Sequence, residues 1–178
     1  MVITLIGMPA SGKTSMGKML SQKLHMKMID GDRLIEAIHG KKLHEIISEV
    51  GNEGFKKIEE EALLSIDEDN VIVSPGGSAV YYESYMKKSK ERGPVIYLYA
   101  SPETLLIRLG DFSKRGIVLP DGFTIKDLYN ERAPLFEKYA DITINCDGQA
   151  YSKYRYQTVS AVKKYISKMN KELNSADK

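Results

Sequence analysis

The chain has 178 residues, of which 42% are hydrophobic and 28% are charged, and its formal net charge is +2. This length suits one folded domain, and the nearly balanced charge argues against a protein specialised for nucleic acids or membrane surfaces. The single cysteine excludes an intramolecular disulfide, and neither a membrane span nor a signal peptide is evident, so we expect a cytoplasmic protein.

The first segment joins a strand to a helix through a glycine-rich loop. Residues 2–6 are apolar and β-branched, which predicts a buried strand, and helical spacing of apolar residues begins at Met16. Between them, residues 7–14 read G-M-P-A-S-G-K-T and match the phosphate-binding motif G-x-x-x-x-G-K-[ST]. In this motif the loop backbone cradles phosphates, Lys13 reaches the β- and γ-phosphates, and the Thr14 hydroxyl binds Mg²⁺. We therefore expect a nucleoside triphosphate to bind here with Mg²⁺.

Two carboxylates follow the second strand. This short strand, near residues 26–29, ends in Asp30-Gly31-Asp32, and a helix with one apolar face follows. Ligands of parallel sheets bind beyond the carboxyl ends of the strands, so the pair is well placed for Mg²⁺ and a substrate hydroxyl. The alternative is that one of them only caps the helix. We favour a functional role for the pair.

Residues 41–67 read as helical, with a break at Gly51. Apolar residues form a stripe on each side of that break, and polar residues occupy the other positions. From periodicity alone, these polar positions form a solvated face with ion pairs between neighbouring turns. They include Lys56, Lys57, Glu59 and Glu60.

The third strand, residues 71–73, runs into the turn Ser74-Pro75-Gly76-Gly77-Ser78. Its glycines either serve the turn alone or let backbone N–H groups approach a bound substrate. We expect a helix over 81–92 and a strand over 95–99. A helix start follows at Ser101-Pro102-Glu103.

An irregular stretch, residues 110–123, contains Arg115 and suggests a lid that closes over the phosphates, although a mobile surface loop is the alternative. A capping box at Thr124 then opens a helix, a strand follows at 141–145, and a closing helix spans about 157–170. The alternation of strands and helices predicts a three-layer α/β/α fold with a central, mostly parallel, five-stranded sheet.

Taken in order, these motifs resemble the shikimate kinases, a family of P-loop kinases related to the nucleoside monophosphate kinases. The resemblance covers about residues 2–170. It rests on the phosphate loop, Asp30-Gly31-Asp32 with Ile35-Glu36, the segment Phe55-Lys56-Lys57-Ile58-Glu59, Gly76-Gly77, Arg108, Arg115, and Arg132-Ala133-Pro134-Leu135-Phe136.

The resemblance implies a role for each matching residue. Lys13, Asp32 and Arg115 would be catalytic, with Asp32 binding substrate hydroxyls and accepting a proton. Thr14 and Asp30 would hold Mg²⁺, with Asp30 acting through water. The acceptor site would comprise Asp32, Lys56, Gly76, Gly77 and Arg132, with Lys56 and Arg132 on the substrate carboxylate. ATP would be bound by Gly7, Pro9, Ala10, Ser11, Gly12, Lys13, Thr14, Ser15, Arg108 and Arg115.

The chain departs from the family pattern mainly around the acceptor. Lys56 stands where the family has an arginine, Pro75 replaces the first glycine of a G-G-G turn, and Ala10 replaces a common glycine of the phosphate loop. In the lid, Arg115-Gly116-Ile117-Val118 stands where R-P-L-L is usual. Lysine neutralises a carboxylate as a point charge, whereas arginine grips it with a bidentate fork.

The sequence thus predicts a single-domain, ATP- and Mg²⁺-dependent kinase that phosphorylates a hydroxyl of shikimate. We expect a monomer whose partner is a small hydroxy acid, with an acceptor-binding helical region at about 31–67 and a lid at about 110–123. A related kinase for another hydroxy acid or polyol is one alternative. For gluconate, however, an H-P-x-x-N-like segment is expected where Arg33-Leu34-Ile35-Glu36 stands. The other alternative is a non-catalytic nucleotide-binding protein of the same fold.

Overall fold

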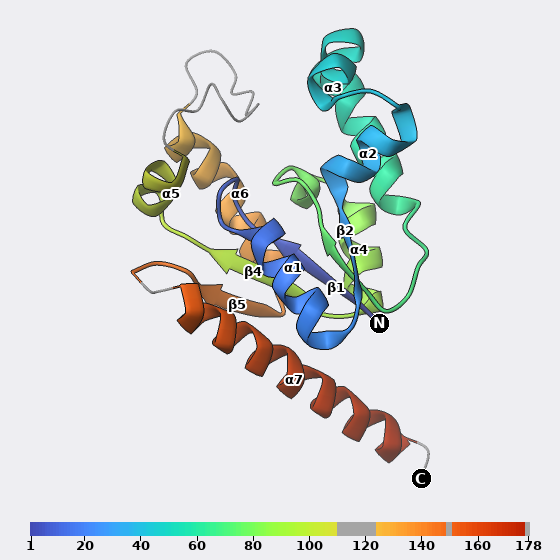
Figure 1. The fold of residues 1–178 in the computed structure, drawn as a ribbon, viewed down its shortest axis with the longest axis vertical. Coiled ribbons are helices and arrows are strands. Elements are labelled where there is room, and N and C mark those ends of the chain that lie inside the picture. The colour runs from blue at the N-terminus through green and yellow to red at the C-terminus, as the bar shows by residue number, and fades with distance from the viewer. Residues whose placement is uncertain (110–123, 149–150, 177–178) are drawn as a thin grey trace.

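The computed structural model describes residues 1–109, 124–148 and 151–176 (Figure 1). The strands are β1 (Val2–Ile6), β2 (Lys27–Asp30), β3 (Val71–Ser74), β4 (Val95–Tyr99) and β5 (Ile142–Asn145). The helices are α1 (Lys13–Leu24), α2 (Gly31–His39), α3 (Leu43–Leu64), η1 (Ala79–Tyr81, a 3₁₀-helix), α4 (Glu83–Arg92), α5 (Pro102–Leu109), α6 (Ile125–Tyr139) and α7 (Tyr151–Ala176). The expected lid at 110–123, with Arg115, lies outside the described residues.

The strands form one sheet in the order β2-β3-β1-β4-β5. All four strand pairings are parallel, which confirms the expected fold class. The sheet is thus entirely parallel, whereas the sequence predicts a mostly parallel one. Parallel strands bring their carboxyl ends to one edge of the sheet. The loop after β1, Asp30 at the end of β2 and the turn after β3 therefore meet at that edge, and Asp30 pairs directly with Ser74.

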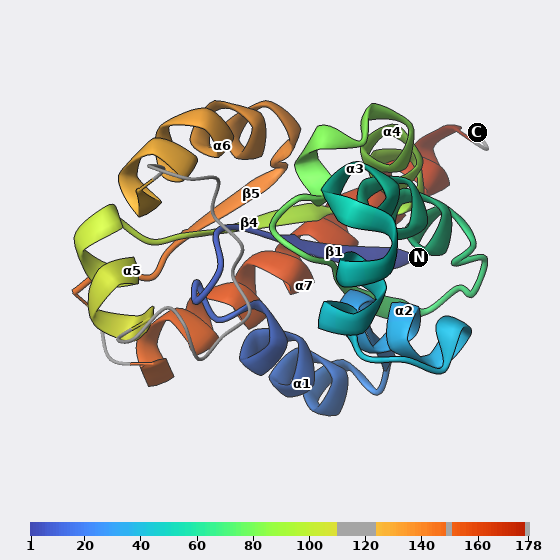
Figure 2. The same cartoon turned by 90° about the horizontal axis from the view of Figure 1, so that it is seen from above.

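Alternate strand residues feed two hydrophobic cores, one on each face of the sheet. In β1, Ile6 belongs to the core under α3, α4, α5 and α6, whereas Ile3 and Leu5 belong to the core under α1 and α7. Figure 2 shows α4 and α6 on one side of the sheet and α1 on the other. Because helices cover both faces of the sheet, every residue of β1 is buried. This explains why residues 2–6 form an almost continuous apolar run and do not alternate with polar residues.

Two segments differ from the expected boundaries. The helix predicted over 81–92 is split, because Tyr82 has extended backbone angles (φ −92°, ψ 91°) between η1 and α4. The closing helix is longer than expected, since α7 begins at Tyr151 and continues to Ala176. The break at Gly51 is present as predicted, with φ 70° and ψ 176° inside α3.

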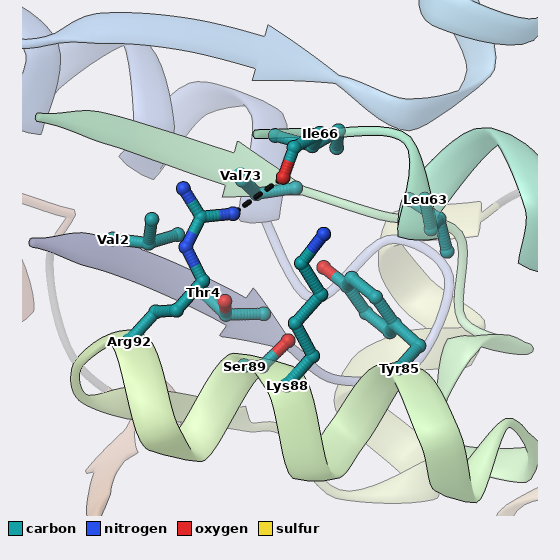
Figure 3. A pocket seen from close by; sticks show the side chains of 9 residues that line it. All are labelled: Val2, Thr4, Leu63, Ile66, Val73, Tyr85, Lys88, Ser89 and Arg92. Atoms are coloured by element: carbon teal, nitrogen blue, oxygen red, sulfur yellow. Dashed lines mark hydrogen bonds between the residues drawn. The ribbon is translucent and has the colours of Figure 1, made fainter. Parts of the chain in front are cut away.

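A small, partly open cavity of about 10 Å³ lies in the core between β1, α3 and α4 (Figure 3). Thr4 and Tyr85 line it, and their hydroxyls have no hydrogen-bond partner within the described part of the chain. Burial raises the pKa of Tyr85 to about 12. The Arg92 guanidinium at the rim donates to the Ile66 carbonyl. Since a volume near 10 Å³ holds about one water molecule, this cavity is no substrate site.

Across residues 1–109, 124–148 and 151–176, no helix combines the length and the apolar character needed to cross a membrane.

Candidate active site

The loop between β1 and α1 has the backbone geometry that a phosphate cradle requires. Gly7 has φ +147°, and a Cβ there would lie 2.8 Å from the Leu98 carbonyl oxygen. Gly12 has φ +102° and stands just before the first residue of α1, so the loop ends at a helix N-terminus. Ala10 adopts φ 62° without being glycine, which costs roughly 1–2 kcal/mol. The backbone thus keeps the loop shape even where Ala10 replaces the usual glycine.

The Lys13 amine folds back over this loop. Its Nζ donates to the carbonyl oxygens of Gly7 at 2.9 Å and Met8 at 3.0 Å. Burial lowers the pKa of Lys13 to about 8, although the negative charge of Asp32 opposes that shift. Within the described residues, the hydrogen bonds of this cation go to two neutral carbonyls. Lys13 gains from exchanging them for phosphate oxygens, because charge-assisted hydrogen bonds between two ions are stronger.

Thr14 and Asp30 lie together at the start of α1 and the end of β2. The Thr14 hydroxyl donates to Asp30 Oδ2 at 3.1 Å, while Asp30 Oδ1 caps α2 by accepting from the Arg33 N–H at 3.4 Å. Asp30 therefore caps α2, as one reading of the sequence proposes, and it also lies beside the Thr14 hydroxyl, with which it is expected to hold Mg²⁺. Hard oxygen donors in this number fit Mg²⁺, which uses one or two protein ligands alongside water and substrate phosphates. No cluster of three or more histidine, cysteine or carboxylate side chains suited to a metal occurs among the described residues.

An open groove of about 430 Å³ begins at this pair of residues. It continues past Lys18 and Arg33 along α1, β2 and α2. Neither Asp32 nor the glycines after β3 line it, so this groove is separate from the expected acceptor site.

Asp32 lies in the first turn of α2, close to several charges. Desolvation raises the pKa of the Asp32 carboxyl, the negative charges of Asp30 and Glu59 raise it further, and Lys13 opposes them. Much of the residue remains accessible to solvent, so a ligand can reach it while neighbouring atoms displace part of its hydration. A carboxylate with raised proton affinity is better suited to accept a proton from a hydroxyl.

Glu59 contradicts the expectation of a solvated face on α3. Its exposed fraction is 3%, and its Oε2 accepts hydrogen bonds from the Ser78 hydroxyl at 2.5 Å and the Tyr82 hydroxyl at 2.6 Å. Its Oε1 lies 2.4 Å from the position that a Cβ on Gly76 would take. The turn after β3 therefore covers Glu59, and a buried carboxylate fixes the turn. Helical periodicity could not show this, because the covering residues come from elsewhere in the chain.

Arg132, on α6, lies on the other side of this turn. Its Nη1 is 3.0 Å from the position of a Cβ on Gly77, and the same position is 3.2 Å from Pro9 in the phosphate loop. Arg132 and Glu59 also both influence the charge state of Lys13. The structure thus brings Lys13, Arg132 and the turn glycines together, as the sequence predicts.

Two other expected site residues have different surroundings. Lys56 is exposed, and its Nζ forms an ion pair with Glu53 at 2.6 Å. Its amine is therefore directed to Glu53 in this structure and not to Arg132. Arg108, at the end of α5, donates to the Cys146 carbonyl at 2.6 Å and to the Ser11 carbonyl at 3.4 Å. Arg108 therefore links the phosphate loop to the loop after β5.

The contact between Gly76 and Glu59 yields a stability prediction. We expect Gly76→Ala to lower the free energy of unfolding by about 1–3 kcal/mol, because the added Cβ would meet Glu59 at 2.4 Å and this carboxylate is buried and held by two hydrogen bonds. Thermal unfolding followed by circular dichroism measures the effect. An unchanged melting temperature would mean that the turn and α3 separate easily.

Comparison with known proteins agrees with this geometry. The family model described as shikimate kinase matches residues 9–167. A shikimate kinase of Vibrio cholerae is 32% identical over 167 residues, which cover 92% of this chain and 96% of the relative. A shikimate kinase of Bacillus anthracis is 41% identical over 113 residues, covering 64% of this chain and 68% of the relative.

Solved structures give the same result. Shikimate kinase from Acinetobacter baumannii, in complex with shikimate, superposes with a TM-score of 0.82 at 26% identity, covering 90% of this chain and 92% of that one. A gluconokinase from Sinorhizobium meliloti superposes with a TM-score of 0.63 at 15% identity, covering 96% of each chain. The gluconokinase likeness is one of fold alone.

Proposed function

Because this chain belongs to the shikimate kinase family, we propose that it transfers the γ-phosphoryl group of ATP to a hydroxyl of shikimate, giving shikimate 3-phosphate and ADP. The observation that carries the proposal is the meeting of Lys13, Asp32 and Arg132 at the carboxyl edge of the sheet. A phosphate-binding cation, a carboxylate of raised pKa and a carboxylate-binding arginine are what this reaction requires.

The phosphate loop would hold ATP. Its backbone N–H groups and the start of α1 favour phosphate oxygens, and Lys13 would exchange its two carbonyl partners for the β- and γ-phosphates. Arg108, anchored to the carbonyl of Ser11, would border the adenine. Arg115, outside the described residues, remains the proposed partner of the transferred phosphoryl group. Phosphoryl transfer depends mainly on such positioning and charge neutralisation.

Thr14 and Asp30 would hold Mg²⁺, with Asp30 acting through a bound water. When bound, the ion neutralises charge on the β- and γ-phosphates. The Thr14 hydroxyl would then turn one of its lone pairs toward the ion, while Asp30 keeps its cap on α2.

The acceptor would lie between α2, the turn after β3 and α6. Asp32 would hold the substrate hydroxyl and accept its proton as the phosphoryl group is transferred. Arg132 would bind the substrate carboxylate, and Gly77, which has no side chain beside Arg132, would let the acceptor approach closely. Gly76 would contribute its backbone N–H group, because Glu59 already fills the space that a side chain there would take. We propose that residues 31–67 form the acceptor-binding region and residues 110–123 the lid of one domain.

Lys56 would bind the substrate carboxylate together with Arg132 once its ion pair with Glu53 is broken. Lys56 and Glu59 are three residues apart on α3, so they share a face of the helix, and the exposed ion pair with Glu53 is worth only about 0–1 kcal/mol. We expect Lys56→Met to raise the KM for shikimate several-fold and Glu53→Gln to lower it slightly, because Glu53 competes for the amine.

Steady-state kinetics with saturating ATP measures both effects, and Lys87→Met, which removes a comparable surface pair with Glu83 on α4, is the matched control. If Lys56→Met behaves like the control, Lys56 has no part in binding the carboxylate.

The function itself is tested by ADP release with Mg²⁺ and ATP against shikimate, gluconate and related hydroxy acids. We expect turnover with shikimate and none in a Lys13→Ala variant. Turnover only with another acceptor would show a kinase of changed specificity. Nucleotide binding without turnover on any acceptor would show a non-catalytic nucleotide-binding protein. We further propose that the protein acts as a cytoplasmic monomer, and the single, buried Cys146 is compatible with a reducing compartment.

A further inference from the structure

Arg132 is held in place by a tyrosine that the functional proposal does not use. Tyr81 is the last residue of η1, directly after the turn that carries Gly76 and Gly77. Its hydroxyl donates to Glu131 Oε1 at 2.7 Å and accepts from Arg132 Nε at 3.0 Å. The guanidinium carbon of Arg132 also lies 5.1 Å from the centroid of the Tyr81 ring. Tyr81 therefore contacts Arg132 through both its ring and its hydroxyl.

These contacts fix which edge of the guanidinium is available. A phenol has one proton to donate, and Tyr81 gives it to Glu131, so the oxygen lone pair faces Arg132 Nε. Within residues 1–109, 124–148 and 151–176, Nε makes the one hydrogen bond found for this guanidinium. The Nη1 atom lies over Gly77. Because Nε is already engaged with Tyr81, a ligand that needs two parallel N–H groups can obtain them only from the edge formed by Nη1 and Nη2.

We propose that Tyr81 is a positioning residue that holds Arg132 so that only its Nη1–Nη2 edge meets the carboxylate of the acceptor. The inference rests on the proposed function, since it names how that carboxylate is bound. Fixing the guanidinium beforehand removes much of the rotamer entropy that a free arginine would lose on binding. It also sets the angle at which the carboxylate enters, and therefore where the acceptor hydroxyl stands relative to Asp32.

The test separates the hydroxyl of Tyr81 from its ring. Tyr81→Phe keeps the ring under the guanidinium and removes only the two hydrogen bonds. We expect the KM for shikimate to rise about tenfold, with kcat and the KM for ATP changed less than twofold, because the lost contact serves acceptor binding alone. The KM for methyl shikimate, whose ester carries no charge, is expected to change little. Tyr156→Phe, at an exposed tyrosine of α7, is the matched control and is expected to change none of these values.

A double-variant cycle shows whether Tyr81 acts through Arg132. We expect Tyr81→Phe to have no further effect on the KM for shikimate in an Arg132→Ala background. Equal rises with shikimate and its methyl ester, additive effects in the double variant, or a KM within twofold of the parent would each overturn the proposal.

A measurement without acceptor separates this proposal from the proposed function. The Nε–H signal of Arg132 in heteronuclear NMR spectra is expected to exchange slowly with water in the parent protein and rapidly in Tyr81→Phe. If the parent does not phosphorylate shikimate, the proposed function fails while this signal still reports whether Tyr81 holds Arg132. Equal exchange in both proteins would overturn the positioning role.

Discussion

Lys13→Met is expected to reduce kcat/KM for ATP by about 10²–10³-fold, because it removes a preorganised cation from the site where phosphate charge must be neutralised. The same variant should be at least as stable as the parent. Burial depresses the pKa of Lys13 to about 8, which means that the folded protein pays to keep this amine charged. Activity would therefore be lost while the melting temperature stays level or rises, a pattern that distinguishes a catalytic role from a structural one.

The depressed pKa of Lys13 also predicts a pH dependence. In the free enzyme the amine loses its charge as the pH rises through about 8, so kcat/KM for ATP should fall above that pH. Bound triphosphate favours the charged amine and raises its pKa, so kcat should stay level over the same interval. Lys18→Met, in the next turn of α1, is the control for a general loss of positive charge. If kcat/KM for ATP stays level up to pH 9.5, the amine of Lys13 does not have a lowered pKa in the free enzyme.

The sequence predicts the nucleotide half of the site well because its parts are close in the chain. The phosphate loop, the strand before it and the helix after it form one continuous unit, so spacing alone places Lys13 and Thr14. Asp30 required one further assumption, that parallel strands end at the same edge. The structure places it 3.1 Å from the Thr14 hydroxyl, as that assumption requires.

The acceptor half was harder to predict because its contacts join distant segments. Helical periodicity assigned Glu59 to a solvated face, yet Ser78 and Tyr82 cover it from 19 and 23 positions away. The sequence could not pair Tyr81 with Arg132, since the two residues lie 51 positions apart. One clue was present in the sequence: two tyrosines and a serine follow the glycine turn, and hydroxyls there need partners once the turn is buried.

Asp32→Asn is expected to reduce kcat by about 10²–10⁴-fold, the range of a lost general base, with little change in the KM for ATP. Asparagine has nearly the same shape and still accepts a hydrogen bond from the substrate hydroxyl, but it does not take the proton. Asp69→Asn makes the same chemical change at a side chain that is 78% exposed and lies outside the proposed acceptor-binding region, and it should leave kcat unchanged. A loss confined to KM would assign Asp32 to binding alone.

The environment of Asp32 gives the same prediction a second, independent readout. Desolvation and the negative charges of Asp30 and Glu59 raise the pKa of Asp32 above its ordinary value of 3.8, so the carboxylate is protonated earlier as the pH falls. The kcat/KM for shikimate should therefore decline on the acid side at a higher pH than an ordinary aspartate would give. Glu59→Gln removes one of these charges and should move that decline to lower pH, whereas Asp32→Asn should abolish it. An acid limb that persists in Asp32→Asn would have to come from another group, and Asp32 would then not be the base.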